Sequence, residues 1–167
     1  VSLKDGPLRE AYEASGISVR VLPFDALDCS ARYYNSHLTR WSERVRMRDC
    51  DMVYANTMNC FFAIDAAHTE KVPSVWNIRE SSYAKESFGR VSNAVAHRAF
   101  KTFQYPYRII FVAGSTRELF EKYNKSNNFA LIKNVLAPQE KTNSSAPNLD
   151  FPKESNLLLN VGTVCSR

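Results

Sequence analysis

Six polar side chains follow or end three apolar runs of the sequence, where we predict that strands end. They are Asn56, Thr57, Asn77, Arg79, Glu80 and Ser115. Amide, hydroxyl and carboxylate groups hydrogen-bond sugar hydroxyls, and an arginine guanidinium offers a planar fork to phosphate or carboxylate. The set therefore predicts a site for a hydroxyl-rich ligand, with Arg79 facing an anionic group of that ligand.

Each of these groups also has a structural interpretation. Arg79 and Glu80 could pair with each other and pin their loop, and Thr57 could cap the helix that follows it. Ser115, with Glu118 three residues later, forms a capping box, although N–H groups at that helix start could also face an anion. Both interpretations stay open at every position.

A strand–helix–strand unit positions the polar residues at 56–57 and at 77–80. Residues 52–55 and 74–78 are short apolar runs, and residues 58–71 are apolar enough for a buried helix. Pro73 ends that helix, because the residue before a proline is pushed out of the α region. Two strands joined in this way form a right-handed parallel crossover. Both polar loops should then lie at the carboxyl edge of the sheet, where open α/β sheets bind ligands.

The same alternation continues along the chain. The further elements that we expect are a helix from Gly6-Pro7 to Gly16, a strand at 17–22, helices at 31–48 and 83–103, a strand at 108–113, a helix from Ser115 and a strand at 129–136. This order predicts an α/β protein with a Rossmann-like, doubly wound parallel sheet flanked by helices.

The helix at 31–48 combines a core stripe with basic residues. Its apolar positions are Tyr34, Leu38, Trp41 and Val45, at the spacing of one helix face. Five arginines flank that stripe, and Tyr33 lies among them. One interpretation is contact with anionic lipid or a lipid-linked acceptor. The other is an ordinary amphipathic helix whose arginines face solvent.

Composition places the chain among ordinary globular proteins. Its 22 basic and 17 acidic residues give a net charge of +5, which does not by itself imply nucleic acid but suits an anionic membrane or a phosphate-bearing ligand. The four cysteines form no CxxC pair and the three histidines form no motif, so we expect no metal and reduced cysteines. No signal peptide or apolar run of about 18 residues is present. We expect a cytoplasmic protein, free or peripheral on the inner face of the membrane.

The C-terminal part has a different composition. Residues 138–155 are rich in Pro, Asn, Ser and Lys without periodicity, which predicts an interdomain linker. Residues 156–167 contain an apolar strand-like run that would open another domain. Because neither end of the chain has a partner in this pattern, we expect an excerpt of a longer protein.

Six stretches occur along the chain in a fixed order: DGPLREAYEASGISVRVLP, DMVYANT, PSVWNIRES, IIFVAGSTRELFEKY, FALIKNVLAP and LLLNVGTVCSR. In this order they resemble successive blocks of the family-4 (group 1) retaining glycosyltransferases. These enzymes have the GT-B architecture, in which two Rossmann-like domains face each other across a cleft. The resemblance implies that residues 1–137 are the N-terminal, acceptor-side domain without its first strand. Residues 156–167 would be the first strand of the nucleotide-sugar domain.

The resemblance also implies a reaction. A sugar would pass from a nucleotide-sugar donor to a glycan or lipid-linked acceptor with retention and without a metal cofactor. Gly162, Thr163 and Arg167 would contact the donor diphosphate, and the family's donor-side glutamates would lie beyond Arg167, so no catalytic residue is assigned. Asn56 stands where relatives often have histidine, and Asn134-Val135 replaces the usual Asn-Gly turn. The alternatives are a non-catalytic Rossmann-like module that binds a ligand or partner, and a sugar-nucleotide epimerase.

Overall fold

The computed structural model of the protein describes residues 1–89 and 91–135. Val1–Asn134 form one compact unit, and the second unit begins at Val135. The predicted linker at 138–155 and the predicted strand at 156–167 lie outside the described residues, as do Gly162, Thr163 and Arg167.

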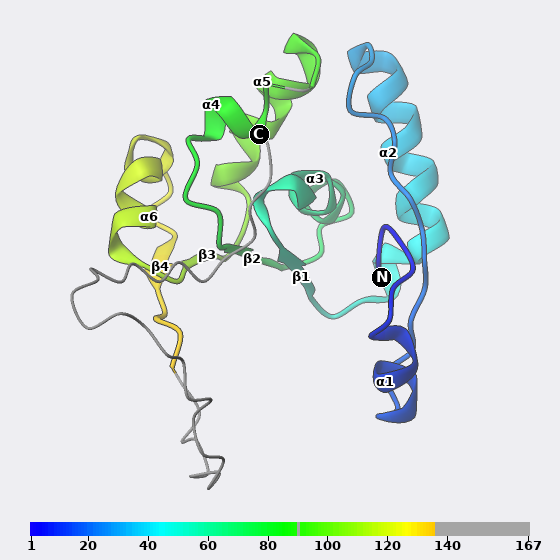
Figure 1. Ribbon diagram of the computed structural model, residues 1–167. Coiled ribbons are helices and arrows are strands. Elements are labelled where there is room, and N and C mark those ends of the chain that lie inside the picture. The colour runs from blue at the N-terminus through cyan, green and yellow to red at the C-terminus, as the bar shows by residue number, and fades with distance from the viewer. Residues whose placement is uncertain (90, 136–167) are drawn as a thin grey trace, which may run out of the picture. The chain divides into compact units, whose positions relative to one another are not determined.

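A parallel sheet of four strands forms the centre of this unit (Figure 1). The strands are β1 (Val53–Asn56), β2 (Ser74–Ile78), β3 (Arg108–Phe111) and β4 (Phe129–Leu131), in that spatial order. The register aligns Ala55 with Trp76, Trp76 with Ile109, and Ile109 with Phe129. The predicted parallel strand–helix–strand unit and the general Rossmann-like α/β fold are therefore confirmed.

Helices connect the strands. They are α3 (Phe61–Thr69), preceded by the 3-10 turn η2 (Met58–Cys60), then α4 (Ala84–Ser87), α5 (Asn93–Lys101) with η3 (Thr102–Gln104), and α6 (Gly114–Phe120) with η4 (Glu121–Tyr123). Two helices precede the sheet, α1 (Arg9–Ala14) and α2 (Ala31–Val45), the second followed by η1 (Met47–Asp49).

The described strands are singly wound, which corrects the doubly wound prediction. Spatial order follows chain order without reversal, so right-handed crossovers place every connecting helix on the same face. Figure 1 shows α3, α4, α5 and α6 on one side of the sheet. Trp76, Ile109 and Phe111 are fully buried on that side. On the other face Tyr54 is 54% exposed and Val75 half-buried, so only one face of the described sheet is covered.

Helix α2 packs as its spacing predicts. Tyr34, Leu38, Trp41 and Val45 are all buried, and Phe24 places its ring edge-on against Tyr34 and Trp41. The Ser30 side chain caps the helix by accepting from the N–H of Tyr33. Arg46, in the left-handed conformation, ends it, so the predicted helix at 31–48 stops three residues early and continues as η1.

Three further element predictions need correction. Residues 17–22 are not a strand: they form one isolated bridge, between Ser2 and Val21, because no described strand lies beside them to extend the ladder. The helix predicted at 83–103 is broken between α4 and α5, where Ser92 starts a new helix by capping the N–H of Val95. The strand predicted at 129–136 is shorter, ending at Leu131.

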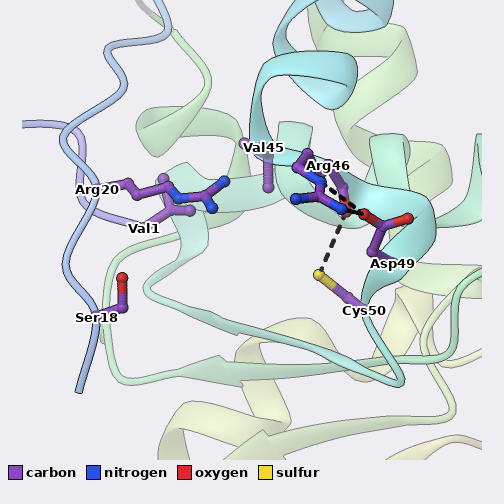
Figure 2. A pocket seen from close by; sticks show the side chains of 7 residues that line it. All are labelled: Val1, Ser18, Arg20, Val45, Arg46, Asp49 and Cys50. Atoms are coloured by element: carbon purple, nitrogen blue, oxygen red, sulfur yellow. Dashed lines mark hydrogen bonds and ion pairs between the residues drawn. The ribbon is translucent and has the colours of Figure 1, made fainter. Parts of the chain in front are cut away.

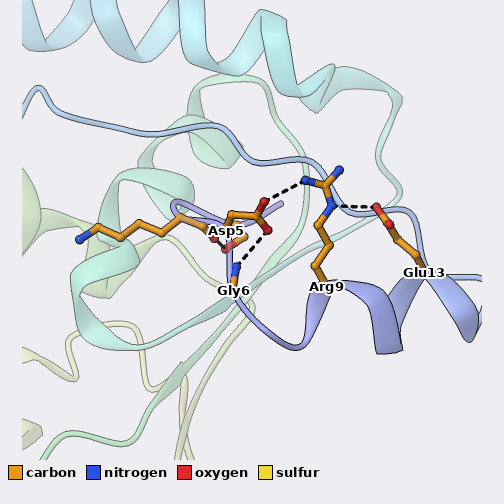
Figure 3. Close-up of polar contacts among 6 residues, drawn as sticks. Asp5, Gly6, Arg9 and Glu13 are labelled. Carbon is orange, nitrogen blue, oxygen red and sulfur yellow. Dashed lines mark hydrogen bonds and ion pairs between the residues drawn. The ribbon is translucent and has the colours of Figure 1, made fainter.

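Helix α1 is held by its own surface contacts. Figure 3 shows Asp5 accepting from the N–H of Gly6 and pairing with Arg9, which also pairs with Glu13, both ion pairs at 3.1 Å. Gly16, at φ +79°, follows the helix as the sequence predicts. No residue of α1 is buried, so this helix adds little to the core.

Candidate functional site

The loops after β1 and β2 are joined at the carboxyl edge of the sheet. The N–H of Thr57 donates to the carbonyl of Asn77 at 2.9 Å, which continues the ladder past the end of β1. The indole N–H of Trp76 donates to the carbonyl of Thr57 at 2.7 Å. Because Trp76 is fully buried, its ring fixes the position of the loop after β1 from the core side.

Glu80 joins the same two loops through its side chain. Its carboxylate accepts from the N–H of Met58, at 3.1 and 3.0 Å to the two oxygens, and from the N–H of Arg79 at 3.0 Å. Glu80 therefore accepts from the first N–H of η2 although it lies in the neighbouring loop. Its negative charge is favourable there, because the N-terminal end of a helix carries partial positive charge. The predicted alternatives fail here: Thr57 makes no side-chain cap, and Arg79 forms no ion pair with any described residue.

Thr57 has a strained backbone. Its φ of 77° and ψ of 151° lie in a region that is essentially reserved for glycine. A β-branched residue in this conformation costs on the order of 1–3 kcal/mol and persists only where surrounding contacts enforce it. The hydrogen bonds of Thr57 to Asn77 and Trp76 supply that enforcement. Strain of this kind clusters at ligand-binding sites, which makes the end of β1 a candidate.

Two asparagine side chains lie side by side at this edge. Asn56 and Asn77 are register partners, and the Asn77 amide donates to the Asn56 carbonyl oxygen at 3.2 Å. The side-chain oxygen Oδ1 of Asn77 is buried and accepts no hydrogen bond from the described residues. Asn56 is exposed. The pair thus retains one acceptor without a hydrogen-bond partner in the described ranges, Asn77 Oδ1, beside the exposed side-chain amide of Asn56.

The loop after β3 reaches the same edge. The hydroxyls of Ser81 and Thr116 lie 3.2 Å apart and connect the second loop to the start of α6. Ser115 is exposed beside them, but it lies inside α6, which begins at Gly114 without a side-chain cap. The N-cap position is Ala113, two residues before Ser115, so the capping-box prediction is wrong. Ser81 and Thr116 adjoin predicted site residues in the sequence, and only the fold brings their hydroxyls together.

Six predicted site residues thus gather at one edge. Asn77 is hydrogen-bonded to Asn56 and Thr57, and Glu80 is hydrogen-bonded to Arg79 and to Met58, which follows Thr57. Helix α6, which holds Ser115, is joined to the second loop through Thr116 and Ser81. Arg79, Asn56 and Ser115 are the exposed members. The arrangement presents neutral hydrogen-bonding groups and one unpaired cation, and can hold a polar ligand with an anionic group.

Two cavities share Val1, Val45 and Cys50 in their linings. One, of about 300 Å³, extends from Asn56 along the strand over the apolar side chains of Trp41 and Phe62. The other, of about 400 Å³, is shown in Figure 2. Arg20 and Arg46 reach it from different segments, and Arg46 pairs with Asp49 there. Neither cavity follows from the sequence pattern, because residues far apart in the chain form both.

Across residues 1–89 and 91–135, no three His, Cys, Asp or Glu side chains are grouped so as to hold a metal ion. In the same ranges no helix has the length and apolarity needed to cross a membrane. Cys29, Cys50 and Cys60 are free thiols.

Comparison of the chain with protein-family models, curated proteins and solved structures finds no significant match. The fold therefore defines the class: an α/β protein with a parallel, Rossmann-like sheet. Its candidate site lies at the carboxyl edge of that sheet, the usual ligand-binding edge of this class.

Proposed function

We propose that this chain is the acceptor-side domain of a retaining glycosyltransferase with GT-B architecture. Such an enzyme moves a sugar from a nucleotide-sugar to a hydroxyl of a glycan or lipid-linked acceptor. The bond from the anomeric carbon to the nucleotide diphosphate breaks, the acceptor oxygen bonds to that carbon with the same configuration, and the acceptor proton leaves with the diphosphate. The described residues would bind and orient the acceptor.

The observation that supports this proposal most is the convergence of polar groups from three strand ends at one sheet edge. The loops after β1 and β2 are hydrogen-bonded to each other there, and the second loop is hydrogen-bonded to the start of α6, which follows β3. These bonds fix the backbone of the site, while the amide of Asn56, the guanidinium of Arg79 and the hydroxyl of Ser115 stay exposed. Preorganised amides and hydroxyls suit sugar hydroxyls, and Arg79 suits a phosphate on the same acceptor.

The ordered resemblance of six sequence stretches to the family-4 glycosyltransferases adds a second line of support. Under this proposal Gly162, Thr163 and Arg167 contact the diphosphate of the nucleotide-sugar. Glycine permits close approach of the backbone, and arginine neutralises charge that develops on the leaving group.

A titration tests the acceptor role directly. The ¹⁵N-labelled chain is titrated with neutral monosaccharides and with their 1-phosphates, and the amide resonances of Asn56, Arg79 and Ser115 are followed. We expect saturable shifts at these residues, and about tenfold weaker binding of the sugar phosphates to Arg79→Ala, because a charge-assisted hydrogen bond is lost. Neutral sugars should bind that variant as they bind the parent chain.

Arg108→Ala is the matched control, because Arg108 is an exposed arginine at the amino end of β3, the opposite edge of the same sheet. Equal losses in the two variants would show charge attraction without a site. Shifts confined to other parts of the chain, or no binding of any sugar, would refute the acceptor role.

A further inference from the structure

The outer face of α2 carries positive charge that the described structure does not neutralise. Two arginines just beyond this helix are paired, Arg46 with Asp49 and Arg48 with Glu70. Arg40 and Arg44, by contrast, form no ion pair with any residue in the described ranges. The sequence of α2 contains a single acidic residue, Glu43.

These two arginines belong to a stripe that lines a concavity. Tyr33, His37, Arg40 and Arg44 follow each other at helical spacing and therefore lie along one face of α2. Together with Trp41 they line a hollow of about 250 Å³. That volume is just below the usual range of small-molecule pockets, and suits a compact group rather than a large ligand.

Neighbouring contacts hold the lining side chains in place. The His37 ring lies edge-on to Phe24, with centroids 5.1 Å apart, and roughly parallel to Tyr33 at 6.0 Å. Arg40 is anchored by a 3.3 Å hydrogen bond from its Nε to the carbonyl of Ser36. Its terminal nitrogens are left available for a ligand.

The lining offers hydrogen-bond donors and no carboxylate. Trp41 supplies only an apolar wall, because its indole N–H already donates to the carbonyl of Leu22 at 3.2 Å. Two guanidinium groups, an imidazole and a phenol remain, and no acidic side chain is among the five lining residues. A hollow that presents two unpaired cations selects an anion.

We propose that this concavity on α2 binds a phosphate group, as a monoester or a diester. A tetrahedral phosphate can accept from Arg40 and Arg44 in different directions, and the arginine fork matches phosphate geometry. The phosphate belongs either to a soluble phosphate ester or to a phospholipid headgroup. This site is separate from the sheet edge and does not depend on the proposed transferase function.

Amide resonances measured against inorganic phosphate test the site. The ¹⁵N-labelled chain is titrated with phosphate at ionic strength held constant with chloride, and Tyr33, His37, Arg40 and Arg44 are followed. We expect saturable shifts there, and about tenfold weaker binding in Arg40→Ala and in Arg44→Ala, because each loses a hydrogen bond to a charged group.

Arg32→Ala is the matched control, since Arg32 is an exposed arginine of the same helix that does not line the concavity. Its phosphate affinity should change less than twofold. An Arg32→Ala loss equal to that of Arg40→Ala would overturn the proposal, because it would show diffuse charge attraction. The resonances of each variant also report whether it is folded.

Vesicles distinguish the two sources of phosphate. Sedimentation with phosphatidylcholine vesicles is compared with and without one-third phosphatidylglycerol. Binding of anionic vesicles that Arg40→Ala weakens about fivefold, as expected for one arginine near a membrane surface, assigns a lipid headgroup. Phosphate shifts without vesicle binding assign a soluble ester. The absence of both phosphate shifts and vesicle binding would overturn the site.

Discussion

Two pairs of acid and arginine in this protein use the same chemistry in opposite ways. Asp65 of α3 is 1% exposed and accepts from Arg98 of α5 at 2.8 Å and from the Tyr34 hydroxyl of α2 at 3.0 Å. Glu80 and Arg79 are neighbours in sequence, yet their side chains do not pair. Glu80 accepts backbone N–H groups, and the Arg79 guanidinium remains exposed.

Burial explains this difference. A charge away from water must be paired and hydrogen-bonded, so Asp65 binds the arginine and the phenol together and joins three helices. At the sheet edge water solvates Arg79, so no partner is required and the guanidinium stays available for a ligand. We therefore interpret the Asp65 cluster as structural, and the exposed Arg79 supports the proposed binding role of the sheet edge.

The largest effect should come from the buried cluster. Asp65→Ala leaves Arg98 and the Tyr34 hydroxyl without their acceptor inside the protein, and should lower the free energy of unfolding by about 3 kcal/mol. Urea denaturation measures the change. Asp49→Ala, which breaks the exposed pair with Arg46, is the control and should cost about 0.5 kcal/mol or less. Equal costs in the two variants would remove the distinction between the clusters.

At the sheet edge, Glu80 should contribute to stability and Arg79 should not. Glu80→Ala removes the acceptor for the N–H groups of Met58 and Arg79, and should destabilise the fold by about 2 kcal/mol. Arg79→Ala should change stability by less than about 0.5 kcal/mol, because the side chain is exposed. Both are measured by urea denaturation. A large cost for Arg79→Ala would contradict its assignment to ligand binding.

Alkaline pH should act on the buried cluster through Tyr34. Burial, and then the neighbouring Asp65, raise the pKa of Tyr34 far above its ordinary value. The folded protein keeps this phenol protonated, whereas the unfolded chain loses the proton near pH 10. Stability is therefore complete below pH 10 and falls by about 1.4 kcal/mol per pH unit above it.

Tyr34→Phe tests this dependence. The variant lacks the phenol, so its free energy of unfolding should fall less steeply between pH 10 and 11 than that of the parent protein, by the contribution of one proton. Denaturation at closely spaced pH values measures both slopes. Identical slopes would mean that Tyr34 does not contribute to alkaline unfolding.

The smallest effect concerns the strain at the edge. Thr57→Gly should stabilise the protein by about 1 kcal/mol, because relief of the positive φ exceeds the added entropy of the unfolded chain. Thr57→Ala removes the same side chain without relieving the backbone and should give no gain. Thermal unfolding of the two variants side by side measures the difference. A gain in Thr57→Ala equal to that in Thr57→Gly would show that the backbone is not strained.

Much of the fold follows from local pattern. The apolar run at 74–78 became β2 without a shift, and the helical spacing of Tyr34, Leu38, Trp41 and Val45 identified the buried face of α2. These features depend on side-chain periodicity, which is a property of short segments. The strand–helix–strand order likewise fixed the parallel sheet and placed the polar loops at its carboxyl edge.

Other predictions failed because they depended on neighbours. Residues 17–22 alternate as a strand does, but a strand exists only where another strand supplies hydrogen bonds, and only Ser2 does so here. Thr57 is a good capping residue by type, yet Glu80 from the next loop performs that role. The doubly wound expectation failed because strand order is decided by packing.

The sequence by itself determined most of the helices and strands and the polar residues that end the strands, because these depend largely on contacts within a few residues. Only the tertiary structure decided which acid meets which arginine. Asp65 and Arg98, 33 residues apart, are paired, and the adjacent Arg79 and Glu80 are not. Pairing depends on distance and exclusion of water in three dimensions, and neither quantity is encoded at any single position of the chain.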